Sequence, residues 1–189
     1  EPTKVRSMGR LDRETSGILT FAKNQTAAAR LQKQRETGLL QKTYLAVVSG
    51  SLLPDTDGSF HTISIPLAPD PDDRLKMVIS LDSTLPGSKY AETCYSVLNT
   101  VNYASQASAS LVMLRLKTGR THQIRVHMAS LGHPLLGDSL YHLSDTTDYF
   151  SRSALHAWKL TLQQPFTQKE ISLEAPLPED FHKFHETIF

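Results

Sequence analysis

The sequence has one cysteine, Cys94, among its 189 residues, and it has no long apolar run. A single cysteine excludes an internal disulfide framework and a cysteine-rich zinc site, and it fits a reducing compartment. No apolar run approaches the roughly 20 residues of a membrane-spanning helix, so we expect no membrane partner. No signal peptide opens the chain. We therefore expect a cytoplasmic protein, with an organelle as the alternative because the chain starts at Glu1 rather than Met.

The net charge is also small, but the value of +1 hides an uneven distribution. Residues 1–42 hold nine Lys/Arg against four Asp/Glu, and residues 109–138 hold four against one. Residues 43–108 hold three against seven, and residues 139–189 hold four against seven. The two basic segments can form one positive face, as binding of a phosphate backbone requires, if the fold brings them together. The alternative is two ordinary solvated surfaces.

Short alternating or apolar runs between turn residues predict an α+β fold with a mixed, mainly antiparallel sheet and a few flanking helices. The length and the hydrophobic content of 39% suit one domain with a substantial core, or two very small ones. Asn24 as N-cap and Gly38 as terminator predict a helix over residues 24–37. Further helices are predicted over 120–131 and around 179–186, strands over 18–22, 41–50, 60–65, 76–79, 91–98, 110–116, 154–162 and 170–173, and loops over 66–74 and 99–108.

Asp12 lies in a polar stretch from Gly9 to Gly17, directly before the apolar run of residues 18–22. That run predicts a buried strand, so Asp12 is expected on a loop at the mouth of a strand, where catalytic side chains are often mounted. The alternative is a structural role, in which Asp12 pairs with Arg10 or Arg13 or caps a turn.

A second polar stretch, from Thr118 to His127, is dense in hydrogen-bond donors. Its side chains need partners because they cannot all point into an apolar core. A glycine at a helix start also leaves backbone N–H groups free for an anion. A metal site on His122 and His127 is the alternative. Their spacing does not stack them on one helix face and no cysteine accompanies them, so we expect no metal.

Three separate stretches have to be considered together. A tyrosine such as Tyr44 on an alternating strand is by itself typical of a core. However, the motifs are Arg-Leu-Asp-x-x-Thr-Ser-Gly, Lys-x-Tyr-x-Ala, and Thr-Gly-Arg-x-His-Gln-Ile-Arg-x-His followed by Gly-His-Pro-x-x-Gly-Asp. In content and order they resemble the RluA-like family of RNA pseudouridine synthases. The resemblance spans nearly the whole chain, with further matches at Ala91-x-Thr93-x-Tyr95, Leu155-His156-Ala157 and Ala175-Pro176-Leu177-Pro178.

The resemblance implies roles for particular residues. Asp12 matches the catalytic aspartate, and Tyr44 matches the tyrosine that stacks on the target base and is proposed to assist proton removal from C5. Arg125 matches the arginine that pairs with the aspartate and holds it ionised. Arg10 matches an arginine that family members can insert where the uridine leaves the RNA stack. The remaining substrate-binding residues that we assign are Thr15, Arg120, His122 and Gln123.

The implied reaction isomerises a specific uridine of a structured RNA, rRNA or tRNA, to pseudouridine. Uracil is detached from C1′ of the ribose, turned and rejoined through C5, with no cofactor and no metal. Asp12 either attacks covalently or takes a ribose proton, and both routes stay open. The base must leave the helix to be reached, and the basic segments would contact the RNA backbone. We expect the protein to be a monomer that binds RNA.

The fold has to join Arg125 to Asp12, which are far apart in the sequence. On the predicted helix, Ile124 and Met128 face the sheet, which turns Arg125 about 100° away from Ile124, toward the cleft. We therefore expect its guanidinium within roughly 4 Å of the Asp12 carboxylate. The alternative is that Arg125 binds an RNA phosphate.

Two features depart from the family pattern. Gly9 stands where the family usually has histidine, which affects the expected local RNA contacts. The family's catalytic domain has strands before the aspartate loop, and few residues precede Arg10 here. We expect residues 1–189 to form a single catalytic domain without its leading strands and without an S4-type domain. A sheet edge would then be open, or filled by another segment or chain.

Two other classes of function compete with the isomerase. One is a catalytically silent RNA-binding relative in which Asp12 is retained for structure. The other is a hydrolase that uses Asp12 and Glu14 as a carboxylate pair, which needs a separation of about 5 to 9 Å that the sequence does not fix.

Overall fold

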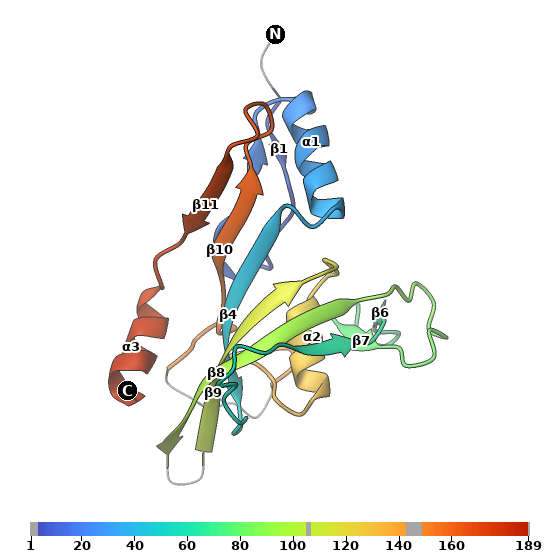
Figure 1. Ribbon diagram of the computed structural model, residues 1–189. Coiled ribbons are helices and arrows are strands. Elements are labelled where there is room, and N and C mark those ends of the chain that lie inside the picture. The colour runs from blue at the N-terminus through green and yellow to red at the C-terminus, as the bar shows by residue number, and fades with distance from the viewer. Residues whose placement is uncertain (1–3, 105–106, 143–148, 189) are drawn as a thin grey trace.

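The computed structural model describes residues 4–104, 107–142 and 149–188, and its core is a seven-stranded sheet (Figure 1). The strand order is β11-β10-β4-β9-β8-β5, and β2 pairs with β10 beside this path. The pair of β2 and β10 is parallel and the other pairs of this sheet are antiparallel. The strands are β2 (Ser16–Gly17), β4 (Gln41–Ser49), β5 (His61–Ser64), β8 (Glu92–Ala104), β9 (Ala107–Leu116), β10 (Leu155–Gln163) and β11 (Glu170–Glu174).

Three helices and two small sheets complete the described part of the chain, so the predicted α+β fold with a mainly antiparallel sheet is confirmed. No helix among the described residues is long and apolar enough to cross a membrane. The helices are α1 (Gln25–Glu36), α2 (Gln123–Ser130) and α3 (Glu179–Ile188), and the small sheets pair β1 (Arg6–Ser7) with β3 (Phe21–Ala22) and β6 (Leu67–Pro69) with β7 (Met77–Ile79).

The central strand β4 is buried on both faces because successive side chains point to opposite sides of a sheet. On one face Tyr44 packs in a cluster with Ile124 and Met128 of α2. On the other face Leu45 packs in a cluster with Phe184 of α3. The prediction that Ile124 and Met128 face the sheet is therefore confirmed, and β4 becomes the element against which both helices are placed.

The helix predicted over residues 24–37 is confirmed as α1. The side chain of Asn24 accepts a hydrogen bond of 2.8 Å from the backbone N–H of Ala27, as an N-cap does. Gly38 follows the helix with a φ of 76°, which glycine adopts without strain. Leu31 packs α1 against Leu160 of β10, so the end of α1 is fixed beside the sheet.

The single buried strand predicted over residues 18–22 is wrong. β2 ends at Gly17, and β3 contains only Phe21 and Ala22, with Phe21 54% exposed. Gly17 has a φ of 107° and lies so close to the backbone of Ala157 that an added Cβ would collide with it. Pairing with a strand about 140 residues later, rather than local hydrophobicity, therefore decides the course of this segment.

The loop predicted over residues 99–108 is also wrong, because β8 continues to Ala104 and β9 begins at Ala107. Residues 105–106 lie outside the described ranges. Thr100 faces Ser110 across the ladder, and their hydroxyl oxygens lie 2.9 Å apart. Small polar side chains bond across the strands here, whereas their composition had indicated a loop. Similarly, β6 lies inside the loop predicted over 66–74.

Candidate active site

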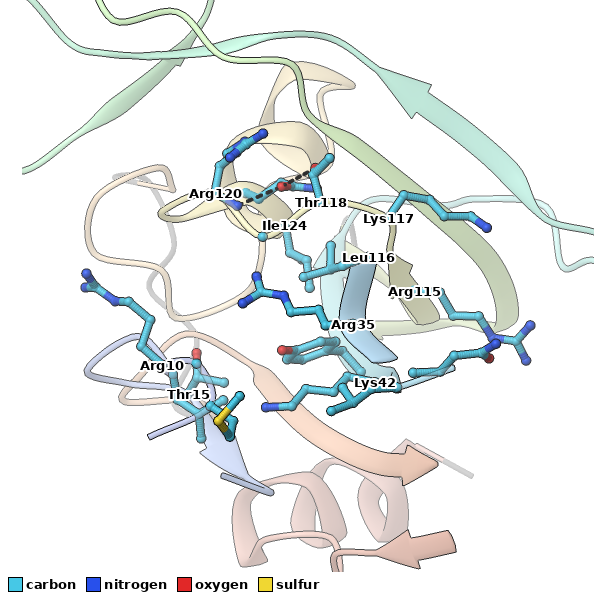
Figure 2. Close-up of a pocket in the computed structure, with 18 of the residues that line it drawn as sticks. Arg10, Thr15, Arg35, Lys42, Arg115, Leu116, Lys117, Thr118, Arg120 and Ile124 are labelled. Carbon is cyan, nitrogen blue, oxygen red and sulfur yellow. Dashed lines mark hydrogen bonds between the residues drawn. The ribbon is translucent and has the colours of Figure 1, made fainter. Parts of the chain in front are cut away.

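A cleft of about 930 Å³ opens between the N-terminal loop, the end of α1, the start of β4 and the turn from β9 to α2. Asp12 and Tyr44 both line it, as do Arg10, Thr15 and Arg120. The fold therefore brings together residues from three distant stretches of the sequence. Figure 2 shows Arg10 and Thr15 on one side of the cleft and Thr118, Arg120 and Ile124 on the other.

Asp12 lies in a tight turn, in which its carbonyl oxygen accepts a hydrogen bond of 3.0 Å from the N–H of Thr15. Within the described ranges, its carboxylate forms neither an ion pair nor a hydrogen bond, so the structural alternative of a pair with Arg10 or Arg13 is not realised. The Asp12 charge contributes to the pKa shifts of Tyr44, His122 and Arg125. A carboxylate that no described residue binds thus faces the cleft.

Glu14 points away from the cleft. Its Oε2 accepts hydrogen bonds from the backbone N–H (3.2 Å) and the hydroxyl (3.1 Å) of Ser153. Arg152 also donates a hydrogen bond of 2.9 Å to the Glu14 carbonyl oxygen. The carboxylate pair that a hydrolase would need is therefore not assembled in the cleft, since only Asp12 of the two lines it.

The loop that carries Asp12 is anchored to the sheet immediately after it. Ser16 and Gly17 pair in parallel with His156 and Ala157 of β10, and Ile18 donates a hydrogen bond of 2.9 Å to the Ala157 carbonyl oxygen. The Ser16 hydroxyl lies 2.9 Å from Nδ1 of His156. Burial lowers the pKa of His156, so this imidazole is neutral near pH 7. The anchor is therefore a neutral hydrogen bond inside the protein.

Tyr44 presents a buried phenol to the cleft from the middle of the sheet. Its side chain is 8% exposed, and burial together with the charge of Asp12 raises its pKa to about 12, against a smaller opposite effect of Arg35. The phenol is therefore protonated at neutral pH. It can donate one hydrogen bond and can offer its ring to a stacked base, but it is not a ready base in the free protein.

The predicted ion pair between Arg125 and Asp12 is wrong, because Arg125 pairs with a different carboxylate. Arg125 binds Asp138 in a bidentate pair, with Nε to Oδ2 and Nη2 to Oδ1 both at 2.7 Å. Burial would raise the pKa of Asp138, but the hydrogen bonds and charge of Arg125 outweigh it and lower the pKa. Gly137, with a φ of 67°, turns the chain so that Asp138 meets α2. The spacing on the helix could not reveal this competing carboxylate.

Tyr141 lies against this ion pair and contacts His122, which was assigned to substrate binding but does not line the cleft. The Tyr141 ring lies 5.1 Å from the Arg125 guanidinium, and its hydroxyl lies 3.0 Å from Nδ1 of His122. The Tyr141 hydroxyl already accepts from the N–H of Met77, so its proton is available for Nδ1. Burial and the charge of Arg125 lower the pKa of His122. His122 has left-handed backbone angles, which explains why α2 begins at Gln123 and not at residue 120.

Gln123, which was assigned to substrate binding, is one of the residues that line the cleft, and its side chain forms hydrogen bonds inside the protein. It is 2% exposed, and its Oε1 accepts from the Thr118 hydroxyl (2.8 Å) and the Arg120 N–H (2.9 Å). Its Nε2 donates to the Glu92 carbonyl oxygen (2.9 Å) and the Thr93 hydroxyl (3.0 Å). Gln123 therefore braces the turn from β9 to α2, and it occupies a backbone N–H that had been expected to face an anion.

Basic side chains outnumber acidic ones among the charged residues that line the cleft. Its acidic lining residues are Asp12 and Glu36. The two basic segments of the sequence thus meet at one cleft, which confirms the expectation that the fold could join them. Several of these residues, Arg35 above all, were not found by the sequence motifs. The basic residues that line the cleft are Arg10, Arg35, Lys42, Arg115, Lys117 and Arg120 (Figure 2).

His122 and His127, the two histidines of the second polar stretch, form hydrogen bonds with different partners. His127 is fully buried, with Nδ1 2.9 Å from the Thr93 hydroxyl and Nε2 2.9 Å from the Ile65 carbonyl oxygen. Among the described residues, no group of three or more His, Cys, Asp or Glu side chains is arranged to hold a metal ion. The described lining of the cleft offers a carboxylate, a phenol, ammonium groups and guanidinium groups.

Comparison with known proteins gives a consistent result. The model of the RNA pseudouridylate synthase family matches residues 1–130. The chain is 42% identical to YhcT of Bacillus subtilis, an uncharacterized RNA pseudouridine synthase, over 100% of this chain and 58% of that protein. It is 36% identical to ribosomal large subunit pseudouridine synthase D of Nitrosomonas europaea, over 95% of this chain and 50% of that protein. The chain thus spans little more than half of these bacterial relatives.

A solved structure supports the same relationship. Human RNA pseudouridylate synthase domain containing 1 superposes with a TM-score of 0.75 at 32% identity, covering 93% of this chain and 70% of that one. Both the sequence match and the shared sheet extend well beyond the short motifs around Asp12 and Arg125. The chain therefore belongs to the RNA pseudouridylate synthase family.

Proposed function

We propose that this protein isomerises a specific uridine in a structured RNA, an rRNA or a tRNA, to pseudouridine. The observation that carries the proposal is the Asp12 carboxylate, which has no partner among the described residues and lies beside the protonated phenol of Tyr44 in a cleft lined by cations. Family membership supports the reaction class. The naming of one relative as a ribosomal large subunit enzyme supports rRNA as the first RNA to test.

In the proposed reaction, Asp12 acts on the ribose of the target uridine. It attacks C1′ to form a covalent intermediate, or it takes a ribose proton, and in both routes the bond between C1′ and N1 breaks. Uracil then turns and a new bond forms between C1′ and C5. In the covalent route the bond between Asp12 and C1′ breaks as this bond forms, and in the other route Asp12 returns the proton to the ribose. The C5 proton leaves and N1 gains a proton. The substrate and the product have the same atoms, so this isomerisation needs no second substrate.

The neighbours of Asp12 are assigned to different parts of this reaction. Tyr44 offers a ring for stacking and a hydroxyl that takes part in proton transfer at C5 once the uracil is bound. Arg10 is exposed at the rim and fills the place that the uridine leaves in the RNA, and Thr15 orients the Asp12 turn. Arg125 is a positioning residue, because its guanidinium holds Asp138 rather than Asp12.

The basic lining supports RNA as the partner. Arg10 and Lys117 are exposed and form no ion pair within the described ranges, so their charges are available for phosphates. Arg120 donates a hydrogen bond of 2.9 Å to the Tyr90 carbonyl oxygen, which orients its guanidinium at the rim. Binding through such contacts should weaken steeply as salt is raised.

Pseudouridine mapping tests the proposal directly. Cellular rRNA and tRNA are compared with and without the gene, and the lost site is then restored by the wild-type protein. Asp12→Asn should keep the fold and abolish restoration, to below about one per cent of the wild-type rate, because loss of the nucleophile or base raises the barrier by several kcal/mol. Asp82→Asn is the matched control, since Asp82 is an exposed carboxylate that does not line the cleft.

The same experiment separates the competing class. A catalytically silent RNA-binding relative would bind RNA while no pseudouridine depends on the gene. Full restoration by Asp12→Asn would contradict the role of the carboxylate, even if the modified site depends on the protein.

A further inference from the structure

Arg35 has an unusual position for a residue in the last turn of a surface helix. It leaves α1 and crosses the cleft to the turn between β9 and α2. A Cβ atom added at Gly119 would collide with Nη2 of Arg35 and would lie 3.6 Å from its Cζ. Figure 2 shows the Arg35 side chain in the middle of the cleft, with Lys42 on one side and Leu116 and Ile124 on the other.

No described residue forms an ion pair or a hydrogen bond with the guanidinium of Arg35 that would explain this position. Among the described residues it forms no ion pair and no hydrogen bond, although it is exposed beside Glu36. The Glu36 carboxylate instead accepts a hydrogen bond of 2.9 Å from Gln32. Five guanidinium donors therefore remain for a ligand, and a planar fork of this kind matches the oxygens of a phosphate.

Electrostatics place this free charge next to the reacting groups. Arg35 adds to the effect of burial in lowering the pKa of Lys42, and it opposes the rise in the pKa of Tyr44. Asp12 acts on Tyr44 in the opposite direction. Tyr44 thus lies near both an anion and a cation, and the cation faces the side of the cleft that Gly119 borders.

We propose that Arg35 is a substrate-binding residue that holds an RNA phosphate next to the nucleotide facing Tyr44, and that Gly119 lacks a side chain so that the guanidinium can lie there. This inference rests on the proposed function, because it needs RNA in the cleft. It adds a contact that none of the three sequence motifs contains. The competing explanation is that Arg35 closes the cleft of the free protein and must leave before RNA enters.

The first test measures binding and its salt dependence with a short fluorescent RNA hairpin that has uridines in its loop. Arg35→Gln should lower the slope of log affinity against log salt by about 0.7 to 0.9, which at 0.15 M salt is a loss of about fourfold to sixfold in affinity. Arg35→Lys should recover most of the slope because the charge is kept. Lys33→Gln is the matched control, since Lys33 is exposed on the same helix but does not line the cleft.

The second test is a double-mutant cycle with Gly119→Ala. The backbone of Gly119 is outside the left-handed region, so alanine fits there if Arg35 moves aside. Gly119→Ala should weaken hairpin binding in the wild-type background and should have no further effect in the Arg35→Gln background. An equal loss in both backgrounds would overturn the arrangement, and so would tighter binding by Arg35→Gln, which is the result that a closing role predicts.

The binding tests remain informative if the proposed function fails. A wild-type protein that binds the hairpin with a salt slope reduced by Arg35→Gln, but forms no pseudouridine, would contradict the isomerase and keep the phosphate contact. Pseudouridine formation with an unchanged slope and affinity in Arg35→Gln would keep the isomerase and refute the contact.

Discussion

The ion pair between Arg125 and Asp138 gives a prediction that the structure makes quantitative. The two side chains are 5% and 0% exposed and are joined by two hydrogen bonds of 2.7 Å. Oδ1 of Asp138 also accepts from the N–H groups of Leu140 (3.0 Å) and Tyr141 (3.1 Å). Asp138→Asn keeps an oxygen for these two backbone donors but leaves a buried guanidinium without its counter-charge. Breaking a buried pair in this way costs about 3 to 5 kcal/mol of unfolding free energy.

The assay is urea unfolding of the wild type, Asp138→Asn, Arg125→Met and the double variant. Each single variant should lose about 3 to 5 kcal/mol, and the double variant should lose clearly less than the sum, because it has no uncompensated buried charge. Glu179→Gln is the control, since it removes an exposed pair with Lys183 and should change stability little. A loss below about 1 kcal/mol for Asp138→Asn, or additivity within about 0.5 kcal/mol, would refute the reasoning.

The other predictions concern the phenol, the acid limb, a glycine and metals. Tyr44→Phe should keep the fold but lower kcat by about 10²-fold or more, and a kcat within about threefold of wild type would remove Tyr44 from proton transfer. Since the Tyr44 pKa is raised to about 12, wild-type kcat should show no Tyr44 ionisation between about pH 7 and 10. Because folding lowers the pKa of Asp138, its ion pair should stabilise the protein fully above about pH 4, and this contribution should be lost as the pH falls further. The unfolding free energy measured in urea should therefore decrease at acidic pH, and Asp138→Asn should make this decrease smaller. Gly17→Ala should cost at least about 2 kcal/mol in unfolding free energy through collision with a neighbouring backbone, clearly more than Gly58→Ala, which shares the positive φ but meets no atom within 4 Å. EDTA should leave pseudouridine formation unchanged, and activity that is lost on chelation and restored by zinc would revive a metal site.

Local signals in the sequence predicted α1 and β4. Asn24 and Gly38 mark the ends of α1, and β-branched residues followed by Gly50 mark β4, because caps, turn residues and strand propensity act within a few residues. The segment after Gly17 could not be predicted in the same way. Its course depends on β10, which is distant in the sequence, and an apolar run gives no information about such a partner.

The candidate site shows the same difference between what local sequence signals predict and what only the fold determines. The motifs identified Asp12 and Tyr44, and the structure places both in one cleft. The partner of Arg125 was predicted from the family resemblance and from helix geometry, which gives the direction of a side chain but not the nearest carboxylate. Asp138 was visible in a motif, yet only the turn at Gly137 shows that it folds back onto α2.

The position of Asp12 is more restricted than its place on a loop suggests. On one side, β2 pairs with β10 and Ser16 bonds His156, which fixes the residues that follow Asp12. On the other side, Gln123 fixes the turn from β9 to α2 through four hydrogen bonds to its side chain. Neither set of hydrogen bonds involves a solvent-exposed charge. A higher salt concentration should therefore weaken RNA binding without loosening the site. We therefore expect hydrogen bonds within the protein to set the distance from Asp12 to a bound ribose, and the surrounding cations to decide whether RNA binds.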